Sequence, residues 1–291
     1  MRLLVRLRAR ANAVYDETYH HKLRGRMWRA LADTPYDDRH SSEPPTGLAF
    51  SNPFPPYDMS AGDSRTLLVA SPDRDLLGEI ADQLPKHEQY NFRDEIAADF
   101  DATPELNVGE MPFEITDQSV LAPDVGEPGT KGVIETGTGV LVRIPPWRFD
   151  DYDIDVDSDQ SEFWKPKHTL DPFQTQIENN LDWKHGHFAP EDLPGPSDVD
   201  GDLFESYELI KTFPLPVTVT EGERETWILS KWKFGYRVRD DTHRRHLNLA
   251  LDTGIGERNA MGFGFLNIDE DSVVPAGRAF KAEPTDREVV G

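Results

Sequence analysis

The sequence predicts an α+β fold in which the element order β-α-β-β-α-β occurs twice along the chain. Two kinds of pattern follow one another in this order within residues 1–122. Alternating apolar and polar residues are typical of half-buried strands, and apolar residues at four-residue spacing are typical of helices. A Pro/Gly-rich stretch at 119–132 then precedes a second series in the same order. The chain has 291 residues, enough for two domains that each bury a core.

The first series begins at residues 2–10, where apolar residues alternate with arginines and predict a strand whose outer face is basic. Apolar residues recur every four positions after Tyr15 and predict an amphipathic helix that ends near Ala32. Strands are further expected at 46–52, 64–71 and 107–117, and a helix with a serine cap and an early proline at 71–84.

The second series has strands expected at 139–145, 207–213, 225–239 and 262–268, with helices at 170–183 and 240–254. Gly254 occupies the position after the last helix, where glycine commonly ends helices. This order is the split βαβ arrangement of ferredoxin-like and RNA-recognition folds. We therefore expect two tandem ferredoxin-like domains, at 1–122 and 123–268, and an acidic, mobile tail at 269–291.

The composition narrows the classes of function. A net charge of -23 argues, taken alone, against nucleic acid as a ligand. Scarce lysine beside abundant Asp and Glu instead resembles proteins of halophilic organisms, whose binding surfaces can stay locally basic. The absence of cysteine excludes disulfides, thiolate zinc sites and a cysteine nucleophile. No apolar run approaches the roughly 20 residues of a spanning helix, so we expect a cytoplasmic protein without a membrane partner.

Basic residues gather at the two ends of this acidic chain, within 1–31 and 231–262. Residues 150–163 are nearly all acidic and predict a solvated loop. The stretch KWKFGYRVR (231–239) interleaves basic and aromatic residues, which is compatible with an RNA-facing strand and equally with a half-buried strand that has a solvated face.

The stretch DTGIGERNAMGFGFLNI (252–268) holds two Gly-x-Gly pairs with Arg258 between them. A dinucleotide fingerprint requires a strand before the glycines and a helix after them, and here the order is reversed. A P-loop is excluded because no Gly-Lys-Ser/Thr follows at the required distance. MGFGFLNI partly matches the aromatic motif of RNA-recognition domains, although Met261 replaces the basic residue. Polymer phosphate is therefore favoured over a cofactor phosphate.

The whole spacing, with a helix before it, a basic residue between the pairs and a strand after it, resembles the C-terminal glycine-rich loop of the RAMP superfamily. It is particularly similar to the CRISPR-associated endoribonucleases that cut precursor CRISPR RNA within its repeats. MRLLVRLRA, YHHKLRGRMWRAL and HSSEPPTGLAFSNPF also resemble that family's N-terminal segments. The resemblance implies repeat RNA as substrate, no cofactor, and other subunits of a multi-subunit interference complex as partners. A non-catalytic RNA-binding subunit of such a complex is the alternative.

Metal-independent cleavage of RNA requires a base for the 2′-hydroxyl, an acid for the departing 5′-oxygen and positive charge around the phosphorus. The products are a 2′,3′-cyclic phosphate and a 5′-hydroxyl, as the resemblance also implies. The family's catalytic histidine falls at His40, in the loop between the first helix and the second strand. Tyr36 and Ser51 are candidate helpers.

The residues expected to contact RNA lie in the two basic regions and the glycine loop: Lys22, Arg24, Arg26, Lys231, Lys233, Arg237, Arg244, Arg245, Gly254, Gly256, Arg258, Asn259, Gly262 and Gly264. Two histidine pairs, His185/His187 and His243/His246, lack a clear third ligand, so we expect no metal site. The second pair flanks two arginines and is a better candidate for RNA contact.

Overall fold

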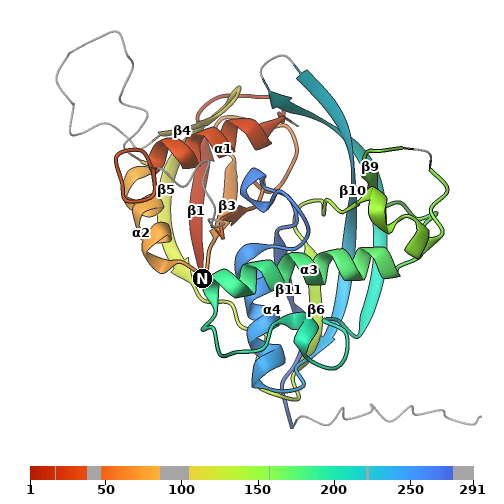
Figure 1. The fold of residues 1–291 in the computed structure, drawn as a ribbon. Coiled ribbons are helices and arrows are strands. Elements are labelled where there is room, and N and C mark those ends of the chain that lie inside the picture. Colours follow the sequence, from red (N-terminus) through yellow and green to blue (C-terminus); the bar gives the residue numbers. More distant parts are fainter. Residues whose placement is uncertain (17, 38–46, 86–104, 157, 221–222, 278–291) are drawn as a thin grey trace, which may run out of the picture.

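A computed structural model describes residues 1–16, 18–37, 47–85, 105–156, 158–220 and 223–277. The chain forms a mixed α/β fold with two large antiparallel sheets, one in each half of the sequence (Figure 1). Helices α1 and α2 pack on the first sheet, and α3 and α4 on the second. The expectation of an α+β fold is confirmed.

The first sheet has the strand order β2-β3-β1-β5-β4. Its elements are β1 (Arg2–Ala9), α1 (Tyr19–Ala30), β2 (Ala49–Phe50), β3 (Ser64–Ala70), α2 (Arg74–Gln83), β4 (Glu105–Val108) and β5 (Met111–Leu121). The apolar residues of β1 are buried between both neighbouring strands and the helices, as their alternation predicts.

Two expectations for the first half are wrong in detail. The helix α2 is capped by Asp73, whose side chain accepts hydrogen bonds from the backbone N–H groups of Asp75 and Leu76, and not by Ser71. The strand expected at 107–117 is a hairpin, because Gly109 adopts a positive φ of 65° and turns β4 back into β5. Strand β5 then continues to Leu121, so part of the expected linker is strand.

The second sheet has the order β11-β6-β10-β9. Its elements are β6 (Lys131–Thr136), α3 (Asp171–Phe188), β9 (Ser206–Thr220), β10 (Glu223–Arg237), α4 (Asp241–Thr253) and β11 (Leu266–Val274). Strand β9 contains Pro214 and Pro216 and lies at the sheet edge, where proline is tolerated because one side of the strand has no ladder partner.

Two strands of this sheet differ from expectation. The first strand, β6, lies partly in the expected linker. Residues 139–145 contribute a single bridge from Val140 to Ser230 of β10 and the strand β7 (Arg143–Ile144), which pairs with β8 (Glu162–Phe163) outside the main sheet. Strand β11 begins at Leu266 and runs to Val274, so residues 269–274 are strand and not tail. These residues pair with β6, which the sequence pattern did not identify as a partner.

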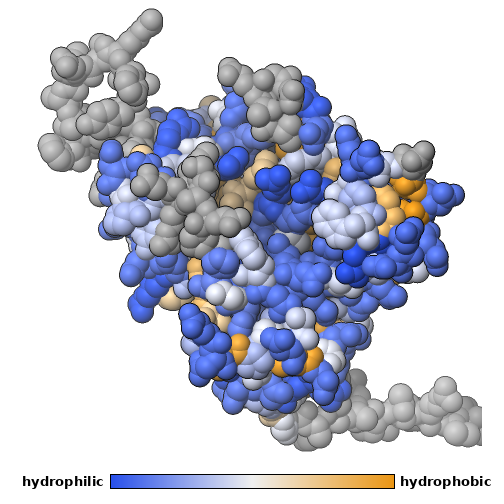
Figure 2. Space-filling view, in the orientation of Figure 1, coloured by the Kyte–Doolittle hydropathy of each residue, from blue (hydrophilic) through white to orange (hydrophobic). Residues whose placement is uncertain are grey.

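Four short 3-10 helices complete the described chain: η3 (Pro146–Arg148), η4 (Asp150–Tyr152), η5 (Pro196–Asp198) and η6 (Asn259–Met261). The acidic segment expected to be a loop contains η4 and β8. The face seen in Figure 2 is mostly hydrophilic, with small separate hydrophobic areas. No helix in the described ranges has the length and hydropathy needed to cross a bilayer.

The two halves have separate hydrophobic cores that are joined by a buried arginine. Arg2 of β1 is 4% exposed, and its guanidinium donates to the backbone oxygens of Leu251 and Leu266 and to Oδ1 of Asn267. Burial lowers the pKa of Arg2 to about 10, against the opposing effect of Asp252. The sequence predicted Arg2 on a solvated face; instead it fixes the first sheet against the end of the glycine loop.

Candidate nucleic-acid interface

The glycine loop (residues 254–264) is shaped by backbone conformations that only glycine adopts without strain. Gly254, Gly256, Gly262 and Gly264 have φ angles of 72°, 68°, 87° and 66°. A methyl group on Gly256 would lie 2.5 Å from the Leu141 oxygen, and one on Gly264 would overlap the Ile255 oxygen. The four glycines are buried, so their main role is close packing of the loop.

Asn259 has a different role from the RNA contact expected of it. Its side chain is 7% exposed, and its Nδ2 donates to the backbone oxygens of Ile255 and Phe263. Lys184 of α3 completes the arrangement, because its Nζ donates to Oδ1 of Asn259 at 2.6 Å and to the Gly254 oxygen at 2.8 Å. Burial lowers the pKa of Lys184 to about 7. Both side chains therefore hold the loop from inside.

Helix α1 docks on the other side of the loop through His20. Its Nδ1 lies 3.1 Å from the Met261 oxygen, and its ring packs between Tyr19 and Phe263. Burial lowers the pKa of His20 to about 3, so the ring is neutral at ordinary pH. Phe263 and Phe265 are fully buried, which excludes base stacking by this part of the motif.

The docking brings cations from opposite ends of the sequence together. Arg258 is exposed at the tip of the loop, in a left-handed conformation with φ of 59°. Helix α1 contacts η6, and Arg258 lies at the start of η6. Burial lowers the pKa of Arg24, and the positive charge of Arg258 lowers it further. Burial followed by Arg24 and Lys22 likewise lowers the pKa of His21. We call Arg24 and Arg258 the cationic site.

No carboxylate of the described residues lies within ion-pair distance of these two arginines. Arg26, expected to contact RNA beside them, is 3% exposed and faces the protein interior. Unpaired cations held close together repel one another unless an anion lies between them. The cationic site is therefore suited to a phosphate group.

The loop tip is also fixed from outside, by β7. Arg143 donates to the Glu257 carboxylate through its backbone N–H at 3.1 Å and through Nε at 2.8 Å, and the two side chains form an ion pair. The N–H of Glu257 in turn donates to the Leu141 oxygen at 2.9 Å. The residue preceding Arg258 is thus held rigidly, which restricts where the arginine can reach.

Two of the three candidate catalytic residues, Tyr36 and Ser51, belong to the described residues. His40 lies outside the described residues. Tyr36 is buried, and its hydroxyl donates to Oδ1 of Asp73, the cap of α2. The Ser51 hydroxyl donates to the Asn52 oxygen and accepts from the Leu68 N–H. The hydroxyls of Tyr36 and Ser51 thus contribute to the packing of the first half, and both residues stay only candidates for catalysis.

Three of the five basic residues of β10 and α4 that we expect to contact RNA are paired with acids. Lys233 pairs with Glu135 at 2.5 Å and Arg237 with Glu205 at 2.8 Å. Arg244 pairs with both Asp124 and Glu127 at 2.8 Å. Arg245 donates to the Thr242 hydroxyl at 3.3 Å.

The histidines of α4 are structural as well. His243 and His246 are 2% and 1% exposed, and their Nε2 atoms lie 2.9 Å from the backbone oxygens of Leu203 and Pro194. Direct contact of these two rings with RNA is therefore excluded in this conformation. Within the described ranges, no three His, Cys, Asp or Glu side chains are grouped as metal ligands.

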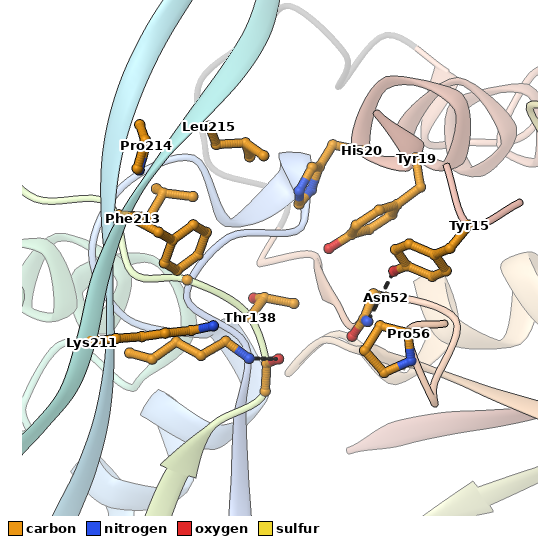
Figure 3. Close-up of a pocket in the computed structure, with 14 residues that line it drawn as sticks. Tyr15, Tyr19, His20, Asn52, Pro56, Thr138, Lys211, Phe213, Pro214 and Leu215 are labelled. Atoms are coloured by element: carbon orange, nitrogen blue, oxygen red, sulfur yellow. Dashed lines mark hydrogen bonds between the residues drawn. The ribbon is translucent and has the colours of Figure 1, made fainter. Parts of the chain in front are cut away.

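Lys231 differs from its neighbours because it borders a cleft between the two halves. The cleft has a volume of about 340 Å³, and an adjoining cavity of about 350 Å³ shares Asn52, Gly137 and Lys231 with it. Figure 3 shows Tyr15, Tyr19 and His20 on one wall and Lys211 and Phe213 on the other. Lys231 donates to the Gly137 oxygen, and burial followed by the charge of Lys211 lowers its pKa.

Sequence reasoning missed Lys211, Tyr15 and Tyr19, the basic and aromatic residues of this cleft. Lys211 lies opposite Lys231 in the β9–β10 ladder. Strand β9 has only one basic residue, Lys211, between Tyr207 and Phe213, so its pattern is much weaker than that of β10. The cleft thus combines aromatic rings with two lysines, a composition suited to single-stranded nucleic acid.

Comparison with known proteins identifies the family. Residues 127–268 match the family model "CRISPR associated protein Cas6, C-terminal". The chain is 52% identical over 270 residues, 93% of its length and 94% of the relative's, to a CRISPR-associated endoribonuclease Cas6 of Haloferax mediterranei, a halophilic archaeon.

The fold has relatives among solved structures. The product of a Cas6-related gene from Pyrococcus furiosus superposes with a TM-score of 0.64 at 18% identity, covering 94% of this chain and 99% of that one. A RAMP protein that binds different RNA substrates gives 0.62 at 17% identity, covering 93% and 100%. From the identity to the Haloferax protein along nearly all of both sequences, the chain belongs to the CRISPR-associated endoribonuclease Cas6 family.

Proposed function

We propose that the protein is a metal-independent endoribonuclease that cleaves precursor CRISPR RNA within its repeats, with His40 as a general acid–base. The observation that carries the proposal is the 52% identity to a CRISPR-associated endoribonuclease over 93% of the chain. The cationic site supports it, because no described carboxylate neutralises it and a phosphodiester needs positive charge where the phosphorane forms.

In the proposed reaction the 2′-hydroxyl attacks the adjacent phosphorus in line with the departing 5′-oxygen. One basic group takes the hydroxyl proton and one acidic group gives a proton to the 5′-oxygen. The bond to the 5′-oxygen breaks, so the products are a 2′,3′-cyclic phosphate and a 5′-hydroxyl. Arg24 and Arg258 would bind the scissile phosphate and stabilise the additional negative charge that it acquires in the transition state.

We also propose that the two halves are tandem ferredoxin-like domains, residues 1–122 and 123–268, followed by a tail. The sheet orders support this. We number the four strands of each β-α-β-β-α-β unit in chain order and leave out the additional edge strand β4. Both sheets then have the same spatial order, which is fourth, first, third and second strand of the unit. Because β11 runs to Val274, the second domain would extend that far. The cleft between the domains would carry single-stranded RNA.

The test is cleavage of labelled repeat RNA in high salt with EDTA, by wild type and by His40→Ala. Wild type should cleave undiminished in EDTA, and the variant should lose activity by about 100-fold or more, the range of a lost general acid–base. His168→Ala is the matched control, because His168 is a partly exposed histidine outside the cationic site and the cleft.

Each outcome bears on one part of the proposal. Full activity of His40→Ala would disprove the His40 assignment, and loss of wild-type activity in EDTA would disprove the metal-free mechanism. Tight binding of the repeat without cleavage would instead favour a non-catalytic RNA-binding subunit. We further expect the cleaved RNA to remain with, or pass to, other subunits of an interference complex.

A further inference from the structure

A small cavity opens beside the glycine loop, on the side formed by α3. Its volume is about 200 Å³, and Leu48, Asn180, Trp183, Arg258 and Ala260 line it. Pockets that enclose a drug-sized ligand measure roughly 300–1,000 Å³, so this cavity suits a single planar group. Arg258 belongs both to the cavity and to the cationic site, which places the cavity directly beside the proposed phosphate position.

Two side chains of α3 give the cavity a chemical character. Trp183 is 45% exposed, although tryptophan usually buries its large surface. Its ring packs on that of His187, with centroids 5.0 Å apart, and Nδ1 of His187 lies 2.7 Å from the Trp183 oxygen. The helix thus presents the Trp183 ring, supported by His187, at a cavity that is also lined by the cationic side chain of Arg258.

Asn180 precedes Trp183 by one helical turn and has an unused acceptor. Its Oδ1 is buried and has no hydrogen-bond partner among the described residues. A buried carbonyl oxygen without a donor lowers stability by about 1–3 kcal/mol in typical cases. The oxygen is consequently a candidate for a donor supplied by a ligand in the cavity.

We propose that the cavity binds one nucleobase of the RNA next to the phosphate held by Arg258. The base stacks on Trp183 and donates from an exocyclic amine to Oδ1 of Asn180. Adenine, cytosine and guanine have such an amine, whereas uracil has only carbonyl oxygens and a ring N–H. At the exocyclic position that makes this contact uracil has only an oxygen, so the cavity selects an amino-bearing base over uracil at one position beside the cut. This inference rests on the proposed function, since it assigns a specificity pocket to the same RNA site.

The test uses repeat RNAs in which each nucleotide near the cut is replaced, one at a time, by uridine or by an abasic residue. For wild type, one position should lower kcat/KM about tenfold or more on either replacement. Trp183→Ala should lose a similar factor on the intact RNA and be indifferent to the abasic residue at that position. Trp183→Phe should retain most of the activity, because it keeps an aromatic face.

The role of Asn180 is tested through the ratio of kcat/KM for the RNA with the amino base to that for the RNA with uracil at that position. General effects of a substitution on folding or charge cancel in this ratio. Asn180→Leu should bring the preference for the amino base over uracil at that position close to one. Asn180→Asp keeps an acceptor oxygen and should keep the preference. Trp147→Ala is the matched control, because Trp147 is 80% exposed and lies on η3, outside the cavity.

The proposal is overturned if Trp183→Ala and Trp147→Ala behave alike, or if the Trp183→Ala loss persists in full on every abasic RNA. An unchanged base preference in Asn180→Leu overturns the amine contact. Should wild type bind the repeat without cutting it, the proposed nuclease activity fails while the same ratios, measured as dissociation constants, still decide the pocket.

Discussion

Two basic regions of the molecule look alike in sequence and differ in the structure. In the β10–α4 region, Lys233, Arg237 and Arg244 are each paired with at least one carboxylate. In the cationic site, Arg24 and Arg258 have each other as neighbours and no carboxylate among the described residues within ion-pair distance.

The difference shows which positive charges an acidic protein leaves for a ligand. With a net charge of -23, the protein has many carboxylates that could pair with an arginine. Two adjacent arginines without a described carboxylate partner therefore require a specific local structure. Here the glycine loop provides that structure, because Lys184 and Asn259 hold the loop from inside and His20 docks α1 against it. The paired cations, by contrast, mainly balance charge within the second half.

The largest effect should come from breaking the loop that presents Arg258. In Gly264→Ala the new methyl group overlaps the Ile255 oxygen at a φ of 66°, so the backbone must shift. We expect a loss of about 3 kcal/mol or more in the free energy of unfolding, measured by denaturant titration, and loss of RNA cleavage. Gly78→Ala is the control, since its methyl group meets nothing within 4 Å. An unchanged unfolding midpoint for Gly264→Ala would contradict the packing role.

The next largest effect concerns the cationic site itself. Arg24→Ala and Arg258→Ala should each weaken repeat binding about 10- to 100-fold, because each removes a charge-assisted contact to phosphate. The slope of log affinity against log salt should also fall by about one per contact removed. Arg29→Ala is the control, since Arg29 is exposed on α1 and donates to the Gly25 oxygen of its own helix. Equal effects of all three substitutions would contradict a defined site.

How far the sequence predicted these regions depends on the range of the interactions. Local signals identified α1, α4 and the end of α4 at Gly254. Strand β6 was not predicted because its apolar residues are few and glycines flank it. Pairing with β10 and β11 nevertheless makes it an inner strand of the second sheet. The glycine-loop spacing and Arg258 pointed correctly to the family that the comparisons identify.

The partners of the charged side chains could not be predicted from the sequence. Arg244 meets Asp124, which is 120 positions away, and no local pattern predicts which of many acids will be the partner. The same holds for Lys184, whose two acceptors lie in the glycine loop. From the sequence alone, a lysine on a helix is expected to be exposed to solvent unless the fold is known to bury it. Side-chain roles that depend on remote partners therefore required the structure.

A smaller effect should reveal how the loop is held. Lys184→Met leaves the Gly254 oxygen and Asn259 Oδ1 without their donor, which should lower stability by about 1–3 kcal/mol and cleavage a few-fold. The folded-state pKa is lowered from 10.5 to about 7, so between these values the unfolded chain binds the additional proton. Wild-type stability should rise with pH across this window by up to ~1.4 kcal/mol per unit, relative to the variant.

The measurement is denaturant unfolding of both proteins at several pH values between 7 and 10.5. The difference between them isolates Lys184, because the other titrating groups are shared. A wild-type curve parallel to that of Lys184→Met would show that the lysine does not change its proton affinity on folding.

The smallest effect is the one that most sharply separates the two regions. Arg244→Ala removes a guanidinium as Arg258→Ala does, yet the charge of Arg244 is already balanced by Asp124 and Glu127. An RNA phosphate would have to displace both carboxylates, so we expect repeat affinity to change by less than about twofold and the salt slope to stay the same. Asp124→Asn should leave affinity equally unchanged. If Arg244→Ala instead weakened binding as much as Arg258→Ala, pairing in the free protein would be no guide to the RNA-binding surface, and the distinction between the two regions would fail.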